Sequence, residues 1–313
     1  MMTIDKKIMA LAAAALIGGA CITAQTTPGG TYDEESGVIV IDPLFEYPLA
    51  PDSIVTLQDR SDWLLEHFWD SMNFKDKATV DQNALNDAFR TFVTPLRFGS
   101  AQAALNACDR LVAQIAKNPV LSLQFAKAAE EALYGPRAEG WNDQVYLKFL
   151  DNLLANKQVK KERKLRYDRQ AKILKSTQVG TVPPEFDYTT PDGKTSHFEP
   201  NGVITVVVFG DPDCDECRMA KLKMDTDVTF TGLVDRGRVN VLFVVADPDE
   251  GWQEKLKNYP EKWHVGASDT VGDLYDLRSV PAIYVMDREG KVAAKNIGVM
   301  SAMALAAAEA NKN

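Results

Sequence analysis

Two kinds of hydrophobic pattern follow one another along the chain. Over residues 53–177, apolar residues recur at the three- and four-residue spacing of amphipathic helices. In "DQNALNDAFRTFV", Asp81 is suited to cap a helix N-terminus, while Leu85, Phe89 and Phe92 share one helical face. No fixed repeat period is visible in this region. The pattern therefore predicts an all-α domain without solenoid repeats.

Short strand-like runs replace the helical spacing over residues 178–313. Phe186 and Tyr188 alternate with polar residues before a Pro-Asp-Gly turn at 191–193, which predicts a hairpin. "VITVVVFG" and "RVNVLFVVADPD" are typical of buried strands, and "PAIYVMDREGKVAAKNIG" predicts two strands joined by a turn. Helices are predicted at about 215–231, in "EGWQEKLKNY" and "VGDLYDL", and at the Ala-rich end. This order predicts an α/β fold, with a central mixed sheet and helices on both faces.

The N-terminus has the pattern of an export signal. Two lysines precede the uncharged run "IMALAAAALIGGACITA", which is short for a membrane span. Two cleavage sites stay open: one after Ala24, giving a signal peptide over 1–24, and one before Cys21, whose "GGAC" context resembles a lipobox. Either predicts a periplasmic or cell-envelope protein, where disulfides persist, with a membrane tether if Cys21 is lipidated. Residues 25–52 are predicted to be a flexible tether and an extended segment.

Charge excludes one class of partner. The 313 residues carry 35 Lys and Arg against 44 Asp and Glu, a net charge of −9, which argues against nucleic-acid binding. Residues 157–175 are a local exception, with nine basic residues and two acids. This segment indicates either a solvated helix or a docking face for an acidic partner.

The four cysteines fall into three groups. Cys21 belongs to the export signal, and Cys108 shares a helical apolar face with Leu111, which predicts a buried free thiol. Cys214 and Cys217 remain as one close pair, in "FGDPDCDEC". The chemistry predicted for the chain depends on this pair.

Metal binding explains the pair poorly. A structural zinc site needs four ligands, but the chain has no second C-x-x-C and its three histidines are scattered. Asp211, Asp213 and Asp215 have the spacing of a calcium loop. That loop also needs a glycine and a glutamate, where this chain has Glu216 and Leu222. We therefore expect neither a metal nor an organic cofactor.

A redox dithiol explains the pair better. Cys214 is predicted to lie where a buried strand ends and a helix begins, and free backbone N–H groups there favour a thiolate. Cys217 follows one helical turn later, close enough to form a disulfide with it. Further along, Pro281 opens a strand after Val280, a placement that suits a special, cis, peptide bond.

These motifs resemble a known family. "VGTVPPEFDYTTPDGK", "VVVFGDPDCDEC" and "LYDLRSVPAIYVMDREGKV" are similar to exported thioredoxin-like proteins of the TlpA/ResA type. The helical region, with "LLEHFWDSMNF", looks like the N-terminal domain of unknown function that accompanies such modules in Gram-negative envelope proteins. The resemblance implies a thioredoxin-like domain over 178–313. It also implies that Cys214 is the attacking thiol, Cys217 the resolving thiol and Pro281 the loop residue that faces them.

The residues expected to contact a substrate lie around this pair: Val280, Phe209 and Asp213. Asp213 stands where the family usually has tryptophan, and "VITVVVF" lacks the carboxylate that thioredoxins often bury in this strand. Acidic neighbours disfavour the Cys214 thiolate. This leaves the disulfide comparatively stable, so we predict a reducing protein.

Two functions follow from the sequence. The first is an exported thiol–disulfide oxidoreductase that acts on disulfide-bearing proteins and depends on an upstream thiol reductant. The second is a redox-inactive thioredoxin-fold binding module whose helical domain docks a protein partner. The retained cysteine pair and proline loop favour the first function, whereas the missing tryptophan favours the second.

Overall fold

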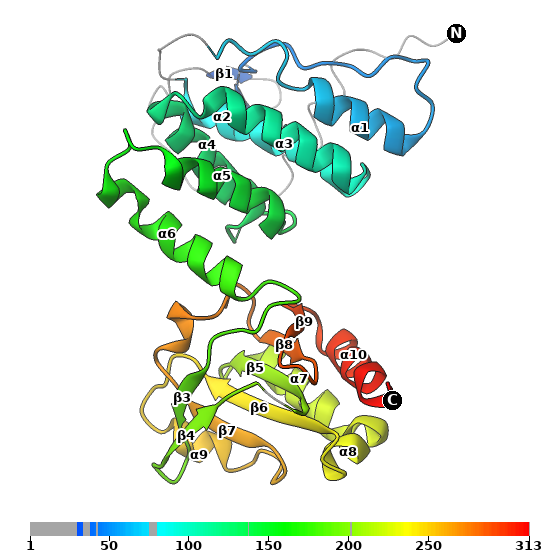
Figure 1. The fold of residues 1–313 in the computed structure, drawn as a ribbon, viewed down its shortest axis with the longest axis vertical. Helices are drawn as coiled ribbons and strands as arrows, with labels where there is room; N and C mark the ends of the chain where they lie inside the picture. The colour runs from blue at the N-terminus through cyan, green and yellow to red at the C-terminus, as the bar shows by residue number, and fades with distance from the viewer. Residues whose placement is uncertain are drawn as a thin grey trace. The chain divides into compact units, whose positions relative to one another are not determined.

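The computed structural model describes residues 30–33, 38–41, 43–74, 80–136, 138–200 and 202–312. The chain divides into two compact units between Asn156 and Lys157 (Figure 1). The predicted signal peptide, with Cys21 and both cleavage sites, lies outside the described residues. Among the residues that are described, no helix combines the length and the apolar character needed to cross a membrane.

The first unit is helical, as predicted. Its described elements are β1 (Gly30–Asp33), β2 (Val38–Ile41), α1 (Leu57–His67), α2 (Gln82–Val93), η2 (Thr94–Arg97), α3 (Ala101–Ile115), α4 (Pro119–Leu133) and α5 (Asp143–Ala155). Strands β1 and β2 pair antiparallel, and α4 packs against both α2 and α5. The Asp81 carboxylate accepts the backbone N–H groups of Asn83 and Ala84, so the predicted N-cap of α2 is confirmed.

An aromatic cluster forms the core of this unit. The Trp69 ring lies 5.5 Å from that of Phe92 and 5.2 Å from that of Phe125, and all three side chains are buried. Phe45, from the extended segment before α1, packs on Phe68 at 5.6 Å. Edge-to-face contacts of this kind add to the stabilisation that burial gives large rings. The extended segment is therefore anchored on the helices.

The second unit is built on a mixed sheet. Its elements are α6 (Lys161–Ser176), β3 (Phe186–Thr189), β4 (Thr195–Phe198), β5 (Ile204–Gly210), α7 (Asp215–Thr226), α8 (Val228–Asp235), β6 (Val239–Val245), α9 (Trp252–Leu256), β7 (His264–Ala267), η3 (Val271–Asp273), β8 (Ala282–Met286), β9 (Val292–Lys295) and α10 (Val299–Asn311). The strand order is β4-β3-β7-β6-β5-β8-β9, with β5, β6 and β7 parallel. This is the predicted thioredoxin-like fold.

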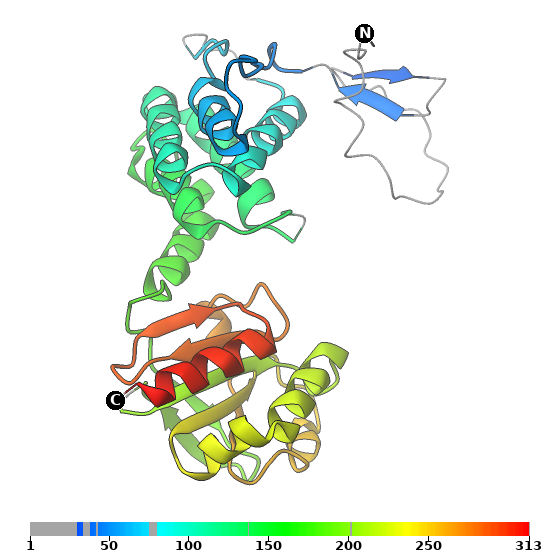
Figure 2. The same cartoon turned by 90° about the vertical axis from the view of Figure 1, so that its right-hand side faces the viewer.

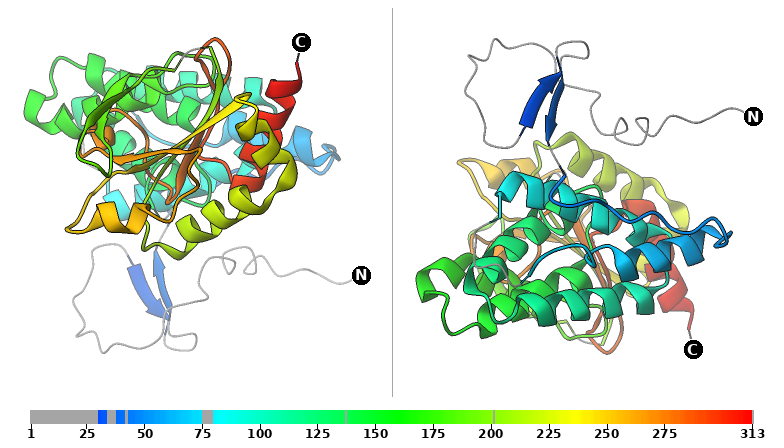
Figure 3. Two further views of the ribbon diagram at one scale, coloured as in Figure 1. Left: turned by 90° about the horizontal axis from the view of Figure 1, so that it is seen from below. Right: turned by 90° about the horizontal axis from the view of Figure 1, so that it is seen from above.

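Each face of the sheet has its own core. Helices α7, α8 and α10 cover one face, and α10 contacts both α7 and α8 (Figures 2 and 3). On the other face, Tyr275 and Val271 from the η3 segment pack against Phe209 and Tyr284. Because β5 is buried on both faces, its continuous β-branched run marks the centre of the sheet.

Three local features differ from the predicted elements. The helix expected at about 215–231 is divided at Asp227, which ends α7 and caps α8 by accepting the N–H of Phe230 at 2.8 Å. "VGDLYDL" forms only the short 3-10 turn η3. Strand β7 was not predicted, because it is short and contains a glycine. A Cβ on Gly266 would lie 2.5 Å from the Thr189 carbonyl oxygen, so this strand crossing requires the glycine.

Helix α6 is counted with the second unit. Its Arg169 guanidinium donates to the Gly272 carbonyl at 3.1 Å and pairs with Asp273. The helix buries Tyr167 and Leu174, whereas none of its basic residues is buried. The basic segment is thus an amphipathic helix.

Candidate active site

The cysteine pair lies where β5 meets α7. Strand β5 ends at Gly210, and Cys214 is the N-cap residue of α7. Its Sγ accepts the Cys217 backbone N–H at 3.4 Å, and both thiols are free. A Cβ on Gly210 would lie 2.9 Å from the Cys217 Sγ, so the glycine lets this sulfur rest against the end of the strand.

The two thiols occupy different environments. Cys214 is partly exposed, whereas Cys217 is fully buried. The pKa of Cys217 is raised to about 12. Burial is the main cause, and the neighbouring Cys214 acts in the same direction. The Asp211 backbone N–H, 3.5 Å from the Cys217 Sγ, acts in the opposite direction. Cys217 is therefore held as a protonated thiol near neutral pH, behind an accessible Cys214.

The proline loop leaves the sheet at the same edge. The Val280–Pro281 peptide bond is cis, as its place in the sequence predicted. Strands β5 and β8 are antiparallel, and Phe209 lies opposite Ala282. Pro281, one residue before Ala282, is therefore at the level of Gly210, one residue after Phe209. Val280 is 58% exposed beside it. The register thus brings together two motifs that are distant in sequence.

A buried ionic network supports this loop. Asp276, in the chain before β8, is only 2% exposed, and its carboxylate accepts from Arg278 Nε at 2.7 Å and from Asn296 Nδ2 at 2.9 Å. Asn296 in turn accepts from the Ser279 hydroxyl at 3.0 Å. The network joins the proline loop to the turn before α10. Sequence reasoning missed it, because nothing in "LYDLRSVP" distinguishes a buried aspartate from a surface one.

A groove of about 420 Å³ lies between α7, the proline loop and the turn before α10. Helix α7 contributes Glu216, Met219, Ala220 and Lys223 to its lining, and the opposite wall includes Pro281, Ile283, Ile297 and Val299. Asp215 and Glu216, in the first turn after Cys214, lie at this groove together with Pro281. The structure therefore joins the dithiol helix and the proline loop in one concave surface.

Two of the acids near Cys214 are paired. The Asp213 carboxylate accepts from Lys255 Nζ at 2.7 Å, and Asp215 pairs with Arg218. Lys255 comes from α9, and the bonds to Asp213 and to a second carboxylate raise its pKa. The sequence shows the acids around Cys214 but not these two cations, which come from contacts formed in the fold.

One acid contacts the thiol itself. Glu216 Oε2 lies 3.5 Å from the Cys214 Sγ, which donates to it. Glu216 is thus the acidic side chain that touches the Cys214 sulfur directly.

The predicted substrate-contact residues divide into two groups. Val280 and Asp213 are exposed at the site. Phe209 is 2% exposed, and its ring packs 4.8 Å from that of Tyr275. This corrects the prediction for Phe209, which belongs to the core: alternation along β5 directs its side chain into the sheet face and away from the loop.

Outside the site, one cysteine, two tryptophans and one histidine that could have carried chemistry have structural roles. Cys108 is buried, as predicted, and burial raises its pKa to about 12. Trp252 and Trp263 are also buried, in the hydrophobic core on the face of the sheet that α7, α8 and α10 cover. His67 stacks on Trp63 at 4.5 Å and contacts Asp70. Across the described ranges, no cluster of His, Cys, Asp or Glu is arranged to hold a metal ion.

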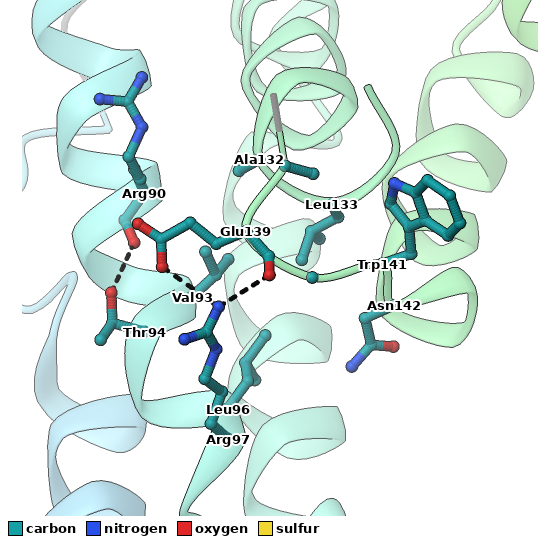
Figure 4. A pocket seen from close by; sticks show the side chains of 12 residues that line it. Arg90, Val93, Thr94, Leu96, Arg97, Ala132, Leu133, Glu139, Trp141 and Asn142 are labelled. Carbon is teal, nitrogen blue, oxygen red and sulfur yellow. Dashed lines mark hydrogen bonds and ion pairs between the residues drawn. The ribbon is translucent and has the colours of Figure 1, made fainter. Parts of the chain in front are cut away.

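The helical unit has a separate cavity of about 220 Å³. Figure 4 shows the Arg97 guanidinium directed at Glu139, whose backbone oxygen it reaches at 2.9 Å and whose carboxylate it reaches at 3.2 Å. Arg90, at the same cavity, pairs with Asp87 and with Glu131. The charged groups of this cavity therefore neutralise one another.

Comparison with family models matches both parts of the chain. The domain of unknown function DUF5106 matches residues 20–177, and the thioredoxin-like domain matches residues 191–311. A comparison with curated proteins found no match.

Similar solved structures cover different shares of the chain, and the first of them shares its fold. A thioredoxin-like protein from Bacteroides caccae is 20% identical with a TM-score of 0.68, over 84% of this chain and 97% of that one. The thioredoxin domain of a thiol-disulfide oxidoreductase from Bacteroides vulgatus is 21% identical with a TM-score of 0.37, over 43% of this chain and 99% of that one. A thiol:disulfide interchange protein from Bacteroides sp. is 22% identical with a TM-score of 0.38, over 44% and 93%.

Proposed function

The chain belongs to the DUF5106 family, here with a thioredoxin-like domain after the helical one, and we propose that it is an exported thiol–disulfide oxidoreductase. The observation that carries the proposal is the asymmetry of the dithiol. Cys214 is accessible at the N-terminus of α7, and Cys217 is buried directly behind it. An attacking thiol must reach its substrate, whereas a resolving thiol needs only to reach the attacking one.

The proposed reaction has two exchange steps. The Cys214 thiolate attacks one sulfur of a substrate disulfide: a Cys214–substrate bond forms, the substrate S–S bond breaks, and the released sulfur takes up a proton. Cys217 then loses its proton and attacks the Cys214 Sγ, which releases the second substrate thiol. Two electrons pass to the substrate, and the protein is left with a Cys214–Cys217 disulfide. An upstream thiol reductant restores the dithiol.

Glu216 supports the reducing direction. A negative charge beside the sulfur favours the uncharged disulfide, so the contact with the Cys214 Sγ makes the oxidised form comparatively favourable. Because Lys255 and Arg218 neutralise the two neighbouring acids, we expect a moderately reducing potential. The chemistry uses only sulfur and protons and needs neither a metal nor an organic cofactor.

The proposed location and partners follow from the sequence. The export signal predicts a periplasmic or envelope protein, with lipid anchoring through Cys21 as one of its two cleavage outcomes. The substrates are proteins with disulfides that extend into the groove beside Pro281.

A redox titration tests this function. The chain is equilibrated in graded dithiothreitol buffers, alkylated and analysed by mass spectrometry, with the buried Cys108 as an internal reference. We expect a reversible two-electron transition confined to Cys214 and Cys217. A pair that stays oxidised in every buffer, or two thiols that never pair, would contradict the proposal and favour the binding-module alternative. With a Cys217→Ser variant, mixed disulfides to the substrates should accumulate on Cys214.

A further inference from the structure

One face of α7 lines the groove with an acidic, then apolar, then basic side chains, in order from the N-terminus of the helix. Glu216, Met219, Ala220 and Lys223 are spaced by three and four residues, so they form a single stripe along the helix. The stripe begins with an acid beside Cys214, continues with an apolar stretch and ends with a base. The groove therefore has an electrical polarity that runs along the direction of α7.

Both ends of the stripe lack an ion-pair partner. Glu216 contacts the Cys214 thiol, and within the described part of the chain no ion pair engages either Glu216 or Lys223. The acids next to them differ, because Asp213 and Asp215 are each bound by a cation. The charges that face the groove are thus the ones available to a ligand.

The middle of the stripe is apolar and open. Met219 is 51% exposed, and it lies across the groove from Pro281, Ile297 and Val299. An exposed thioether opposite aliphatic side chains offers an adaptable surface to an apolar residue of a partner. A ligand that fits this groove therefore combines two charges with an aliphatic side chain between them.

We propose that the groove selects disulfide substrates by charge order, an inference that rests on the proposed function. The preferred segment carries a basic residue next to its cysteine, then an aliphatic residue, and an acidic residue about three positions beyond the basic one. Lys223 is seven residue steps along the helix from Glu216, a rise of about 10 Å at 1.5 Å per residue. An extended peptide covers that span in about three residues.

The same contact places recognition beside the reactive sulfur. Glu216 Oε2 lies 3.5 Å from the Cys214 Sγ. A substrate lysine or arginine that pairs with Glu216 therefore brings the neighbouring substrate cysteine to the attacking thiol. A substrate of the preferred order is held with its disulfide at Cys214, whereas free small disulfides are not.

Two peptides of equal composition test the proposal. One contains Cys-Lys-Leu-Ala-Glu and the other Cys-Glu-Leu-Ala-Lys, each with its cysteine joined to thionitrobenzoate through a disulfide. Attack by Cys214 of the reduced full chain joins the peptide to Cys214 and releases the coloured thionitrobenzoate anion. The absorbance of this anion, followed over time, gives the rate constant of the attack. Reaction of both peptides with free dithiothreitol corrects for their intrinsic reactivity. We expect the first peptide to react about fivefold faster after this correction, with the ratio falling as salt is added.

Charge-swap variants identify the residues responsible. The double variant Glu216→Lys with Lys223→Glu should invert the ratio. The matched control Glu254→Lys with Lys257→Glu exchanges an exposed pair on and beside α9, and should leave the ratio unchanged. If the groove double variant does not fold, the single changes Glu216→Gln and Lys223→Gln should each bring the ratio closer to one.

The two levels of the proposal fail differently. A corrected ratio of one in the wild type, or a ratio that the groove swap leaves unchanged, overturns charge-order selection while the dithiol chemistry stands. If neither the peptides nor 5,5′-dithiobis(2-nitrobenzoate) release thionitrobenzoate, the proposed function is overturned, and charge-order selection with it.

Discussion

The cavity of the helical unit and the groove of the thioredoxin-like unit are both lined by charged side chains, but they use them differently. At the helical cavity, Arg97 is bound by Glu139, and Arg90 by two acids. At the groove, the ion pairs of the described residues leave Glu216 and Lys223 without a partner. Charges that satisfy one another hold segments of the chain together. Charges left facing a groove are free to select a ligand.

The cysteines of the two units show the same contrast. Cys108 in α3 is buried among helices, and among the described residues its thiol forms no disulfide. Cys214 is accessible, with Cys217 one turn behind it. Cys108 therefore acts as a small apolar side chain in the core, whereas Cys214 is placed where it can react.

The largest expected effect is on activity. Replacing Cys214 by serine should abolish disulfide reduction, because serine cannot form the mixed disulfide. Cys108→Ser, in the helical unit, should leave the rate unchanged when measured on the folded protein. Turnover of an insulin-type disulfide substrate with a thiol reductant is the assay. Residual turnover in the Cys214 variant would mean that another group carries the reaction.

The second prediction concerns alkylation of the native, reduced protein. Iodoacetamide attacks thiolates, and a pKa of about 12 leaves Cys217 and Cys108 ionised to about one part in ten thousand at pH 8. Both should react at least a thousandfold more slowly than cysteine in an unfolded peptide, and Cys214 should be modified first. The protection of Cys217 should weaken as the pH rises toward 12.

Peptide mapping by mass spectrometry assigns each modified cysteine. Unfolding the protein in urea provides the control, because it should make all three described cysteines react at similar rates. Rapid native modification of Cys217 would contradict its placement behind Cys214.

Much of the fold could be predicted from the sequence. The β-branched run of β5 and the Asp81 cap are local patterns. Each depends on a few neighbouring residues, so it can be read directly from the sequence. The cysteine pair at a strand end and the Val280–Pro281 bond were likewise visible, because each motif is confined to a few residues. These features located the candidate site.

Contacts between distant segments could not be predicted. Lys255 lies 42 residues from Asp213, and no pattern in either segment indicates that they pair. The burial of Asp276 and the side chains of the groove wall likewise depend on how α10 and β8 meet the site. Because β5 is a continuous apolar run, its sequence did not show which side chains face the loop, so Phe209 was assigned to the wrong role.

Buried and exposed ion pairs of the two units should differ in stability. Asp276→Ala removes a carboxylate that holds Arg278 and Asn296 inside the second unit, and should lower the free energy of unfolding by about 3–5 kcal/mol. Arg97→Ala breaks the pair with Glu139 in the helical unit, where both side chains are at least half exposed. It should cost about 0–1 kcal/mol.

Chemical denaturation followed by circular dichroism measures both variants. If the Asp276 variant were as stable as the wild type, the ionic network beneath the proline loop would have no structural role.

The smallest effect concerns the charge beside the reactive thiol. Glu216→Gln keeps the shape of the side chain and removes the negative charge 3.5 Å from the Cys214 Sγ. Removing a negative charge beside a sulfur that reacts as an anion should accelerate alkylation of Cys214 at pH 7 and low salt about threefold. Lys255→Gln should have the opposite effect, since it leaves Asp213 without its cation. Glu254→Gln, on α9, is the control and should change nothing. Equal rates in all three variants would show that solvent screens these charges completely at Cys214, and that the groove cannot tune the thiol through Glu216.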